Sequence, residues 1–258
     1  MERLRKKVAI VTGAGQGIGL AIADRFSSEG ARVVIAERNP ESGSAAARDL
    51  KGKTGNDTLF VETDVADGDA IQEMLRRTHA AFGAVDILVN NAGIAVCLNP
   101  LEVTKDDWDR CMAVDLEGAW LCCKAVLPEM LERRYGAIIN IASVHGSSVM
   151  RSAFPYPVAK HGILGLTRAL ALQYADKGIA VNAISPGFID TPIADWCFGR
   201  AVDPIAAREV ERKKQPIQRF GLPSEVAAVA ALMASDEARF MVGANVVIDG
   251  GVSVRLYD

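Results

Sequence analysis

Short apolar runs alternate with longer amphipathic segments along this chain. The runs are rich in Val and Ile and nearly continuous in apolar residues, which is typical of strands covered on both faces. They lie at residues 7–12, 32–36, 58–62, 85–90, 137–142, 179–185 and 244–249. The amphipathic segments lie at 18–29, 41–51, 67–81, 105–134, 157–176 and 223–234. This alternation predicts an α/β fold, with a doubly wound parallel sheet, helices on both faces and right-handed crossovers.

The organisation of the chain indicates one domain that spans residues 1–258. It contains no linker, low-complexity tract or internal repeat, and its length suits one large α/β unit. Residues 188–222 interrupt the alternation, because they hold Pro192, Pro204 and Pro216, many charges and no clear strand. A long excursion directly after the sixth strand predicts a lid over the substrate, rather than a plain loop.

Composition and charge exclude several classes of protein. The 29 basic and 32 acidic residues are well mixed, with a net charge of −3, so we expect no nucleic-acid partner. No apolar run reaches the roughly 18 residues that a membrane span requires, and "MERLRKK" lacks the features of a signal peptide. The cysteine count is odd and no C-x-x-C occurs, which favours reduced thiols in a cytoplasmic protein without a metal site. The cysteines are Cys97, Cys111, Cys122, Cys123 and Cys197.

A glycine-rich turn, "VTGAGQGIG", lies between the first strand and the first helix. Gly13, Gly17 and Gly19 permit a tight turn and a close approach of the backbone to a pyrophosphate, which would face the N-terminus of the helix. Gln16 and Ile18 belong to the same turn and are assigned to the same site. Such a turn alone is a weak signal, but its place between strand and helix strengthens the prediction of a dinucleotide site.

Glu37 ends the second strand, 18 residues beyond Gly19. A dinucleotide fold requires an acidic side chain near this position to accept hydrogen bonds from the adenosine ribose. The same carboxylate would repel a 2′-phosphate, so Glu37 favours NAD over NADP, although Arg38 beside it would attract a phosphate. The alternative is a solvated residue at a strand end.

Other strand ends supply further candidates for the cofactor site. Asp64 and Val65 follow the third strand, where an adenine ring would be held. Small residues and an amide after the fourth strand leave room for a flat cofactor, and the turn after the sixth strand would hold the nicotinamide amide. These candidates are Asn91, Ala92, Gly93, Pro186, Gly187, Ile189 and Thr191. Each fragment alone is also compatible with ordinary turn chemistry.

A tyrosine and a lysine, Tyr156 and Lys160, are spaced to share one face of a helix. Pro157 favours a helix start at this point, so the phenol is expected at the helix mouth as an oriented acid/base. Its ordinary pKa is near 10, and both an ammonium and an oxidised nicotinamide favour the phenolate. The alternative is a packed tyrosine beside an extended lysine. Ser143 ends the fifth strand, and its hydroxyl would bind the substrate oxygen beside the phenol.

These motifs together resemble the short-chain dehydrogenase/reductase family. The matching residues are "TGAGQGIG", "NNAG", Ser143, "YPVAK" and "SPG", in the family's order and over nearly the whole chain. The resemblance implies a Rossmann domain with a seven-stranded parallel sheet, a nicotinamide cofactor and a homotetramer. It also implies that Ser143 orients the substrate, that Tyr156 is the acid/base, and that Lys160 binds the ribose and tunes the phenol.

One position departs from the family pattern. In "AVDLEGAW", Asp115 stands where the family commonly has an asparagine that holds a water in a proton relay. An aspartate also binds water, and its charge would stabilise Lys160. We therefore assign Asp115 to the catalytic set.

The substrate is the least determined part of the prediction. His145 and Arg151 lie between Ser143 and Tyr156 and are substrate-site candidates, with a solvated loop as the alternative; Arg151 would bind a carboxylate. The lid segment resembles those of family members that oxidise sugars, sugar acids or hydroxy acids. We therefore expect NAD-dependent hydride transfer between a small secondary alcohol, as a sugar, polyol or hydroxy acid, and its ketone. The alternatives are a 3-oxoacyl thioester reductase, which usually prefers NADPH, and a non-catalytic NAD-binding sensor or scaffold.

Overall fold

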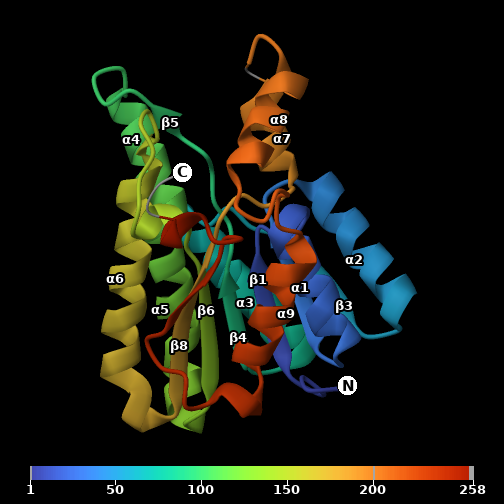
Figure 1. The fold of residues 1–258 in the computed structure, drawn as a ribbon. Coiled ribbons are helices and arrows are strands. Elements are labelled where there is room, and N and C mark those ends of the chain that lie inside the picture. Colours follow the sequence, from blue (N-terminus) through green and yellow to red (C-terminus); the bar gives the residue numbers. More distant parts are fainter. Residues whose placement is uncertain (1, 200, 256–258) are drawn as a thin grey trace.

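The protein is a sheet between two layers of helices (Figure 1). The computed structural model describes residues 2–199 and 201–255, without the side chains of Trp196 and Cys197. Within these residues one seven-stranded sheet has the order β3-β2-β1-β4-β6-β8-β9, and every pairing in it is parallel. The strands are β1 (Val8–Thr12), β2 (Arg32–Glu37), β3 (Thr58–Glu62), β4 (Ile87–Asn90), β6 (Gly136–Ile141), β8 (Ile179–Pro186) and β9 (Asn245–Ile248). The predicted doubly wound fold is confirmed.

The strand order reverses direction at β1, which pairs with β2 on one side and β4 on the other. In open α/β sheets such a reversal opens a crevice at the carboxyl ends of the two central strands, where ligands bind. The glycine-rich turn follows β1, and the segment Asn91–Gly93 follows β4. The fold therefore brings these two predicted parts of the cofactor site together.

Helices connect successive strands, and several of them begin at a capping side chain. The Asn39 side chain accepts hydrogen bonds from the first turn of α2, and Asp67 does the same for α3. Such caps satisfy amides that have no partner inside the helix. The helices are α1 (Gly17–Ser28), α2 (Pro40–Thr54), α3 (Gly68–Phe82), α4 (Lys105–Met112), α5 (Gly118–Arg133), α6 (Tyr156–Tyr174), α7 (Pro192–Gly199), α8 (Pro204–Lys214) and α9 (Pro223–Ala234). Short 3₁₀ turns cover Val144–Gly146, Ala175–Lys177, Asp236–Ala238 and Val252–Val254.

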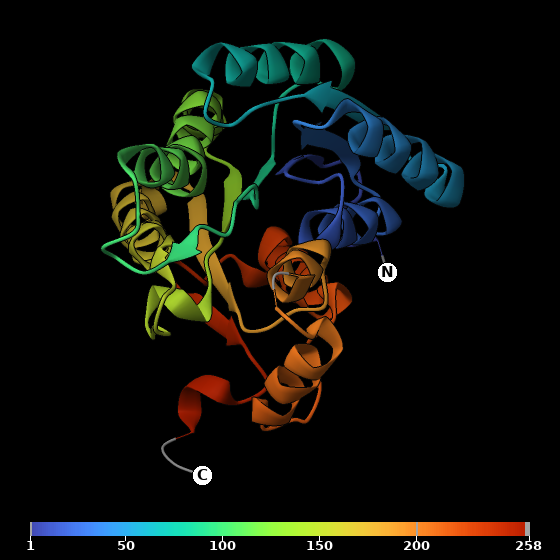
Figure 2. The same ribbon diagram turned by 90° about the horizontal axis from the view of Figure 1, so that it is seen from above.

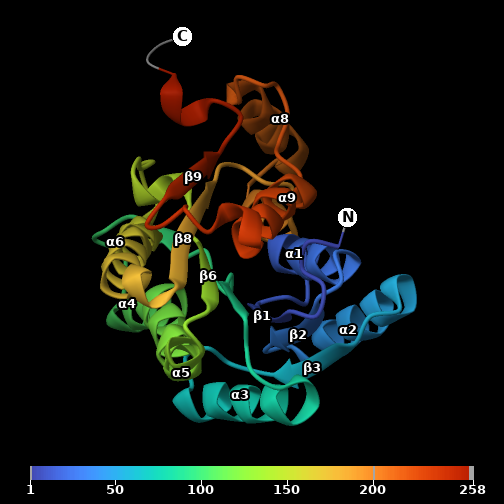
Figure 3. The ribbon, with the colours of Figure 1, turned by 90° about the horizontal axis from the view of Figure 1, so that it is seen from below.

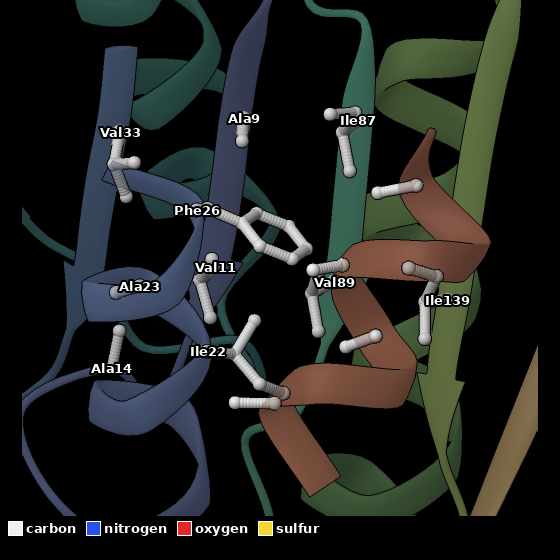
Figure 4. Packing of buried hydrophobic residues seen from close by; sticks show 14 of the residues in the cluster. Ala9, Val11, Ala14, Ile22, Ala23, Phe26, Val33, Ile87, Val89 and Ile139 are labelled. Carbon is white, nitrogen blue, oxygen red and sulfur yellow. The ribbon is translucent and has the colours of Figure 1, made fainter. Parts of the chain in front are cut away.

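Two apolar cores lie on the two faces of the sheet. Helices α1, α2 and α9 cover one face, and α3, α5 and α6 cover the other (Figure 3). Side chains alternate along β1, so that Ala9 and Val11 enter the first core while Ile10 enters the second. In Figure 4 the ring of Phe26 from α1 lies against side chains of β1 and β4. Burial on both faces explains why the strands appear in the sequence as continuous apolar runs.

The segment 105–134, expected as one long helical stretch, is interrupted. Helix α4 ends at Met112, a π-helical turn covers Ala113–Glu117, and α5 begins at Gly118. Gly118 packs so closely on the segment after β3 that a Cβ there would lie 2.8 Å from the carbonyl oxygen of Val65. π-Helical turns occur often at functional sites, and this one contains Asp115.

Two features of the connections were not predicted. A second, two-stranded antiparallel sheet joins β5 (Cys97–Leu98) to β7 (Phe154–Pro155). Residues 188–222 form α7 and α8, and a parallel bridge between Ile189 and Gly221 closes the base of the excursion. Seen from above, α7 lies beside α1 and α8 lies farther out, while β5 lies on the other side of the molecule's upper face (Figure 2).

Candidate functional site

The glycine turn after β1 is pressed against the end of β4. A Cβ on Gly13, whose φ is +62°, would lie 2.8 Å from Cα of Ala92, and a Cβ on Gly19 would lie 2.3 Å from the carbonyl oxygen of Gly13. The side-chain amide of Asn91 donates to the carbonyl oxygens of Thr12 (2.9 Å) and Gly13 (3.1 Å). Only glycine fits these positions, so the backbone of the turn is held in one conformation.

The start of α1 leaves its first amides available. Gln16 occupies the N-cap position with an extended backbone, and among the described side chains none caps these amides. Unpaired N–H groups at a helix N-terminus attract anions. Ile18 lies in this first turn, and Gly17 faces Thr191, whose Cγ2 would be 3.5 Å from a Cβ on that glycine. The turn therefore fits the pyrophosphate of a dinucleotide.

Glu37, at the end of β2, lies beside the same turn. Its carboxylate accepts hydrogen bonds from the backbone amides of Gly15 (3.1 Å) and Asn39 (3.0 Å). Arg38 lies on the outside, where its guanidinium is 3.9 Å from the partly exposed carboxylate of Asp64. The carboxylate of Glu37, not the guanidinium of Arg38, is thus the charge nearest the turn backbone. Of the two residues predicted for the adenine, Asp64 is partly exposed and Val65 is buried against Gly118.

The predicted nicotinamide residues follow β8. Pro186 ends this strand, and the Gly187 amide donates to the carbonyl oxygen of Ile248 at 2.9 Å. A Cβ on Gly187 would lie 2.8 Å from Cα of Asp249. Ile189 is buried, and the Thr191 hydroxyl donates to its carbonyl oxygen at 3.3 Å. Through the contact with Gly17, this segment borders the glycine turn.

Helix α6 begins at Tyr156, one position before the start at Pro157 that the sequence predicted. Lys160 lies one turn later in this helix. The Lys160 Nζ is 5.3 Å from the centroid of the Tyr156 ring. Ser143 follows β6, is 7% exposed, and accepts a hydrogen bond from the His145 amide at 3.1 Å. A hydrogen bond from Ser143 also lowers the pKa of the phenol. The structure thus brings Ser143, Tyr156 and Lys160 together at the carboxyl edge of the sheet.

Asp115 lies beside this group in the interior. Its Oδ2 is 3.6 Å from Nζ of Lys160, and both side chains are almost completely buried. Oδ1 accepts a hydrogen bond from the Ile94 amide at 2.8 Å, whereas Oδ2 has no hydrogen-bond partner among the described residues. Lys160 donates to the carbonyl oxygen of Ile141 at 3.2 Å. A Cβ on Gly93 would approach both Nζ and the carboxylate to about 3.5 Å, so the end of β4 borders the pair as well.

Burial sets the direction of the pKa shift for Tyr156 and Asp115, but not for Lys160. Burial raises the pKa of Tyr156, and Asp115 raises it further, while Lys160 and Ser143 lower it without reversing the direction. Burial also raises the pKa of Asp115, against the effect of Lys160. For Lys160, burial lowers the pKa, but Tyr156 and Asp115 outweigh it. The sequence predicted a lowered pKa for the Tyr156 phenol from the combined effect of the Lys160 ammonium and an oxidised nicotinamide. The ammonium alone does not lower the pKa of the phenol below its ordinary value.

The two substrate candidates lie in different places. The His145 ring meets Tyr156 edge to face with centroids 5.9 Å apart. Its Nδ1 is 3.2 Å from the carbonyl oxygen of Ser148, and burial lowers its pKa. Arg151 is exposed and lines a cavity of about 720 Å³ with Met150 and Val158, whose lining includes none of the catalytic candidates. The structure therefore associates His145, but not Arg151, with Tyr156.

Thr12 is a site residue that sequence reasoning missed. Its hydroxyl accepts hydrogen bonds from the amides of Asn91 and Ala92, each at 3.0 Å, and donates to Val89. It thereby joins the ends of β1 and β4. The available signal was a single hydroxyl at the end of an apolar run, directly before the first glycine of the turn.

The part of the chain that the structure describes contains neither a metal-binding cluster nor a membrane-spanning helix. No group of three or more His, Cys, Asp or Glu side chains there is placed to hold a metal ion. Likewise, no helix within residues 2–199 and 201–255 has the length and apolarity for a membrane span. Cys111, Cys122 and Cys123 are buried, and the side chain of Cys197 lies outside the described part.

Comparison with known proteins identifies close relatives. A family model described as enoyl-(acyl carrier protein) reductase matches residues 13–253. The cis-4-hydroxycyclohexanecarboxylate dehydrogenase of Sinomonas cyclohexanicum is 41% identical, over 97% of this chain and 98% of that protein. The D-threitol dehydrogenase of Mycolicibacterium smegmatis is 38% identical, over 98% and 95% respectively. The crystal structure of L-sorbose reductase from Gluconobacter frateurii with NADPH and L-sorbose has a TM-score of 0.93 at 32% identity, covering 99% of this chain and 100% of that one.

These similarities extend over almost the full length of each protein. The structural match agrees with the parallel sheet and the flanking helices described above. The chain belongs to the short-chain dehydrogenase/reductase family and is an oxidoreductase of that family.

Proposed function

We propose that the protein is an NAD-dependent dehydrogenase that interconverts a small secondary alcohol and its ketone. The observation that carries this proposal is the position of Tyr156, which stands between Ser143 and Lys160 at the same sheet edge as the glycine turn. When bound, the dinucleotide supplies a hydride acceptor or donor at the nicotinamide C4 atom. The chain supplies the groups that bind, orient and exchange protons.

In the direction of oxidation, the phenolate oxygen of Tyr156 takes the proton of the substrate hydroxyl. At the same time the hydride leaves the carbon that carries this hydroxyl and would go to the oxidised dinucleotide. The products are then the ketone, a neutral phenol and the reduced dinucleotide, so charge and atoms balance. Ser143 donates a hydrogen bond to the substrate oxygen and orients it. Lys160 stabilises the phenolate through its positive charge. In reduction the phenol returns the proton.

We propose NAD as the cofactor because Glu37 lies beside the glycine turn. A carboxylate there accepts hydrogen bonds from ribose hydroxyls and repels a 2′-phosphate. The sorbose reductase was solved with NADPH, so the preference of this chain needs a direct test. Native protein and a Glu37→Ser variant would be compared in KM for NAD and NADP. We expect the native protein to favour NAD and the variant to lose the preference; equal use of both cofactors by the native protein would contradict this role of Glu37.

The substrate class that we propose is a sugar, polyol or hydroxy acid. Support comes from the relatives named for a hydroxy acid and for threitol, and from His145 beside Tyr156. The carbonyl oxygen of Ser148 can only accept a hydrogen bond, so Nδ1 of His145 carries the proton. In the neutral ring Nε2 is then an acceptor, which suits a second hydroxyl of the substrate.

A second candidate is reduction of a 3-oxoacyl thioester; the description of the matching family model favours the related reduction of an enoyl thioester. A third is a non-catalytic NAD-binding sensor, for which the buried charge of Asp115 beside Lys160 is the supporting feature. One substrate panel separates the three. Purified protein would receive NAD or NADP with sugars, polyols, hydroxy acids, 3-oxoacyl thioesters and enoyl thioesters, and nicotinamide absorbance would report turnover. We expect oxidation of a small polar alcohol; turnover of thioesters alone, or none with any compound, would refute the first proposal.

The organisation of the protein is part of this proposal. We propose a single domain with a lid at residues 188–222, assembled as a cytoplasmic homotetramer, as the family resemblance implies. Light scattering of the purified protein would give the molar mass in solution. A mass of one chain would contradict the tetramer.

A further inference from the structure

Arg208 of α8 joins two carboxylates that come from different parts of the excursion after β8. One guanidinium nitrogen, Nη2, is 2.5 Å from Oδ1 of Asp190, and the other, Nη1, is 2.6 Å from Oδ1 of Asp195. Asp190 lies in the segment that leaves β8, and Asp195 lies in α7. The guanidinium thus connects that segment, α7 and α8.

The same guanidinium packs on a cluster of three phenylalanine rings. Its central carbon lies 5.2 Å from the ring centroid of Phe220 and 5.8 Å from that of Phe198. Phe188 completes the cluster, with its centroid 4.8 Å from Phe220 and 5.3 Å from Phe198. The rings come from both ends of the excursion and from α7. Arg208 therefore contacts the segment after β8, helix α7 and the end of the excursion, which are the three parts that contribute rings to the cluster.

The segment that these contacts hold borders the cofactor site. Asp190 and Asp195 flank Thr191, whose side chain packs on Gly17 in the glycine turn. Among the described residues, backbone hydrogen bonds join the two ends of the excursion at its base, from Asp190 to Gly221 and from Gly221 to Phe188, each at 2.9 Å. Above that base, Arg208 connects α8 to residues on both sides of Thr191, namely Asp190 and Asp195.

We propose that Arg208 is a positioning residue that holds Ile189–Thr191 in place for the nicotinamide half of the cofactor. The proposal rests on the proposed function, because it takes the dinucleotide to lie along the glycine turn with its nicotinamide toward Thr191. Arginine suits the role, since its planar fork binds two carboxylates while its face stacks on rings, and a lysine ammonium does not do both.

An exposed ion pair usually contributes little to stability. The arrangement around Arg208 differs from an isolated exposed pair because it combines several contacts. The Arg208 side chain is 34% exposed and shares one guanidinium among two carboxylates and two aromatic faces. Lys213, on the same helix, makes an ordinary pair with Glu209 at 3.7 Å and is 67% exposed. It provides a matched control with the same charge on the same element.

The test compares binding of NAD and of ADP-ribose, which lacks the nicotinamide, by titration calorimetry. In Arg208→Ala we expect NAD to bind about 5- to 20-fold more weakly, because a smaller fraction of the protein holds the competent segment. ADP-ribose should bind with a change of less than about twofold, since it does not reach that segment. Lys213→Ala should leave both affinities unchanged.

Two further variants separate geometry from charge. Arg208→Lys retains the cation but not the fork, so we expect NAD affinity between those of the native protein and Arg208→Ala. Asp190→Asn retains an acceptor oxygen but removes the negative charge of the partner nearest Thr191, and it should also weaken NAD binding selectively. Thermolysin cleavage within residues 188–222, without cofactor, should be faster in Arg208→Ala and Asp190→Asn than in Lys213→Ala.

Three results would overturn the inference. Equal weakening of NAD and ADP-ribose would assign Arg208 a general structural role, and unchanged NAD affinity would assign it none at this site. Full rescue by lysine would show that charge alone suffices. If the native protein binds neither NAD nor NADP, the proposed function itself fails, and this inference fails with it.

Discussion

At the scale of single residues, Tyr156, Lys160 and Asp115 form one coupled set of titratable groups. Lys160 lies between the other two, 5.3 Å from the Tyr156 ring centroid and 3.6 Å from Asp115 Oδ2. Its positive charge lowers the pKa of the phenol, whereas the carboxylate raises it. The aspartate therefore makes the phenol a weaker acid while it keeps Lys160 protonated.

Tyr156→Phe tests the acid/base role. Removal of the hydroxyl should lower kcat by about 10²- to 10⁴-fold, the range for loss of a general acid/base. NAD affinity should change by less than about tenfold, because at most one neutral hydrogen bond is lost. Steady-state kinetics and calorimetry measure the two quantities. Tyr174→Phe, at the other end of α6, is the control and should change neither; substantial residual turnover in Tyr156→Phe would refute the role.

Asp115→Asn tests the effect of the buried charge. Without the carboxylate the pKa of Tyr156 falls, so the acidic limb of the kcat/KM profile for alcohol oxidation should move to lower pH. Turnover should fall by less than about 100-fold, because the acid/base itself remains. A pH–rate profile measures both effects. Complete loss of turnover would mean that the acid is used directly, and an unshifted profile would mean that Asp115 carries no charge.

At the scale of elements, the glycine turn and the helix that follows it depend on close backbone contacts. Gly19→Ala would place a Cβ 2.3 Å from the carbonyl oxygen of Gly13 and 2.4 Å from the amide nitrogen of Asn91. The turn must move, so we expect a loss of about 1–3 kcal/mol in stability. NAD affinity should fall at least about tenfold, since about 1.4 kcal/mol of lost interaction already has that effect.

Gly52→Ala is the matched control for that variant. Gly52 lies in α2 and is exposed, and a Cβ added to it would have no neighbour within 4 Å among the described atoms. Alanine there should stabilise the protein by about 0.5–1 kcal/mol and leave NAD affinity unchanged. Denaturant unfolding and calorimetry check both variants. Native-like NAD binding by Gly19→Ala would contradict the assigned contact.

Elements differ in how far the sequence predicts them. The seven strands and the main helices were predicted, because a strand buried on both faces has a continuous apolar run. The strand pair β5–β7 was missed, because a strand of two residues is too short to show an alternation of apolar and polar positions. The π-helical turn at Asp115 was missed because one extra residue in a turn leaves the surrounding helical pattern almost unchanged. The contacts of Arg208 are tertiary and have no local signal.

At the scale of the whole molecule, the sheet order explains why the sequence could predict that the candidate site residues lie near one another, although it could not predict their contacts. Residues that follow β1, β2, β4, β6 and β8 all lie at one edge of a parallel sheet. Motif positions at strand ends therefore place Glu37, Ser143 and Thr191 near one crevice. Hydrogen-bond partners such as Thr12 with Asn91, and the separation of Arg151 from Tyr156, depend on loop conformation and packing.

The opposite edge of the sheet contains an ion-pair group that ties the N-terminal segment to the end of α1. Glu29 is 4% exposed and accepts hydrogen bonds from Arg3 at 2.6 Å and from Arg25 at 2.5 Å. Burial raises the pKa of Glu29, but the two guanidinium groups outweigh it and lower the pKa below the ordinary value. The resulting stability is fully present above the unfolded pKa and is lost as the pH falls through the folded pKa.

Glu29→Gln should therefore destabilise the protein at pH 7 by about 1.5–3 kcal/mol, the range for hydrogen bonds to charged groups. The difference from the native protein should shrink as the pH falls below the ordinary pKa of glutamate, about 4.3. Urea unfolding at several pH values measures it. Glu73→Gln removes an exposed pair with Arg76 on α3 and should change the stability much less than Glu29→Gln does at pH 7, because exposed ion pairs contribute little. Because the group lies far from the catalytic edge, NAD affinity should stay unchanged in both variants, and a pH-independent loss in Glu29→Gln would contradict the ionic account.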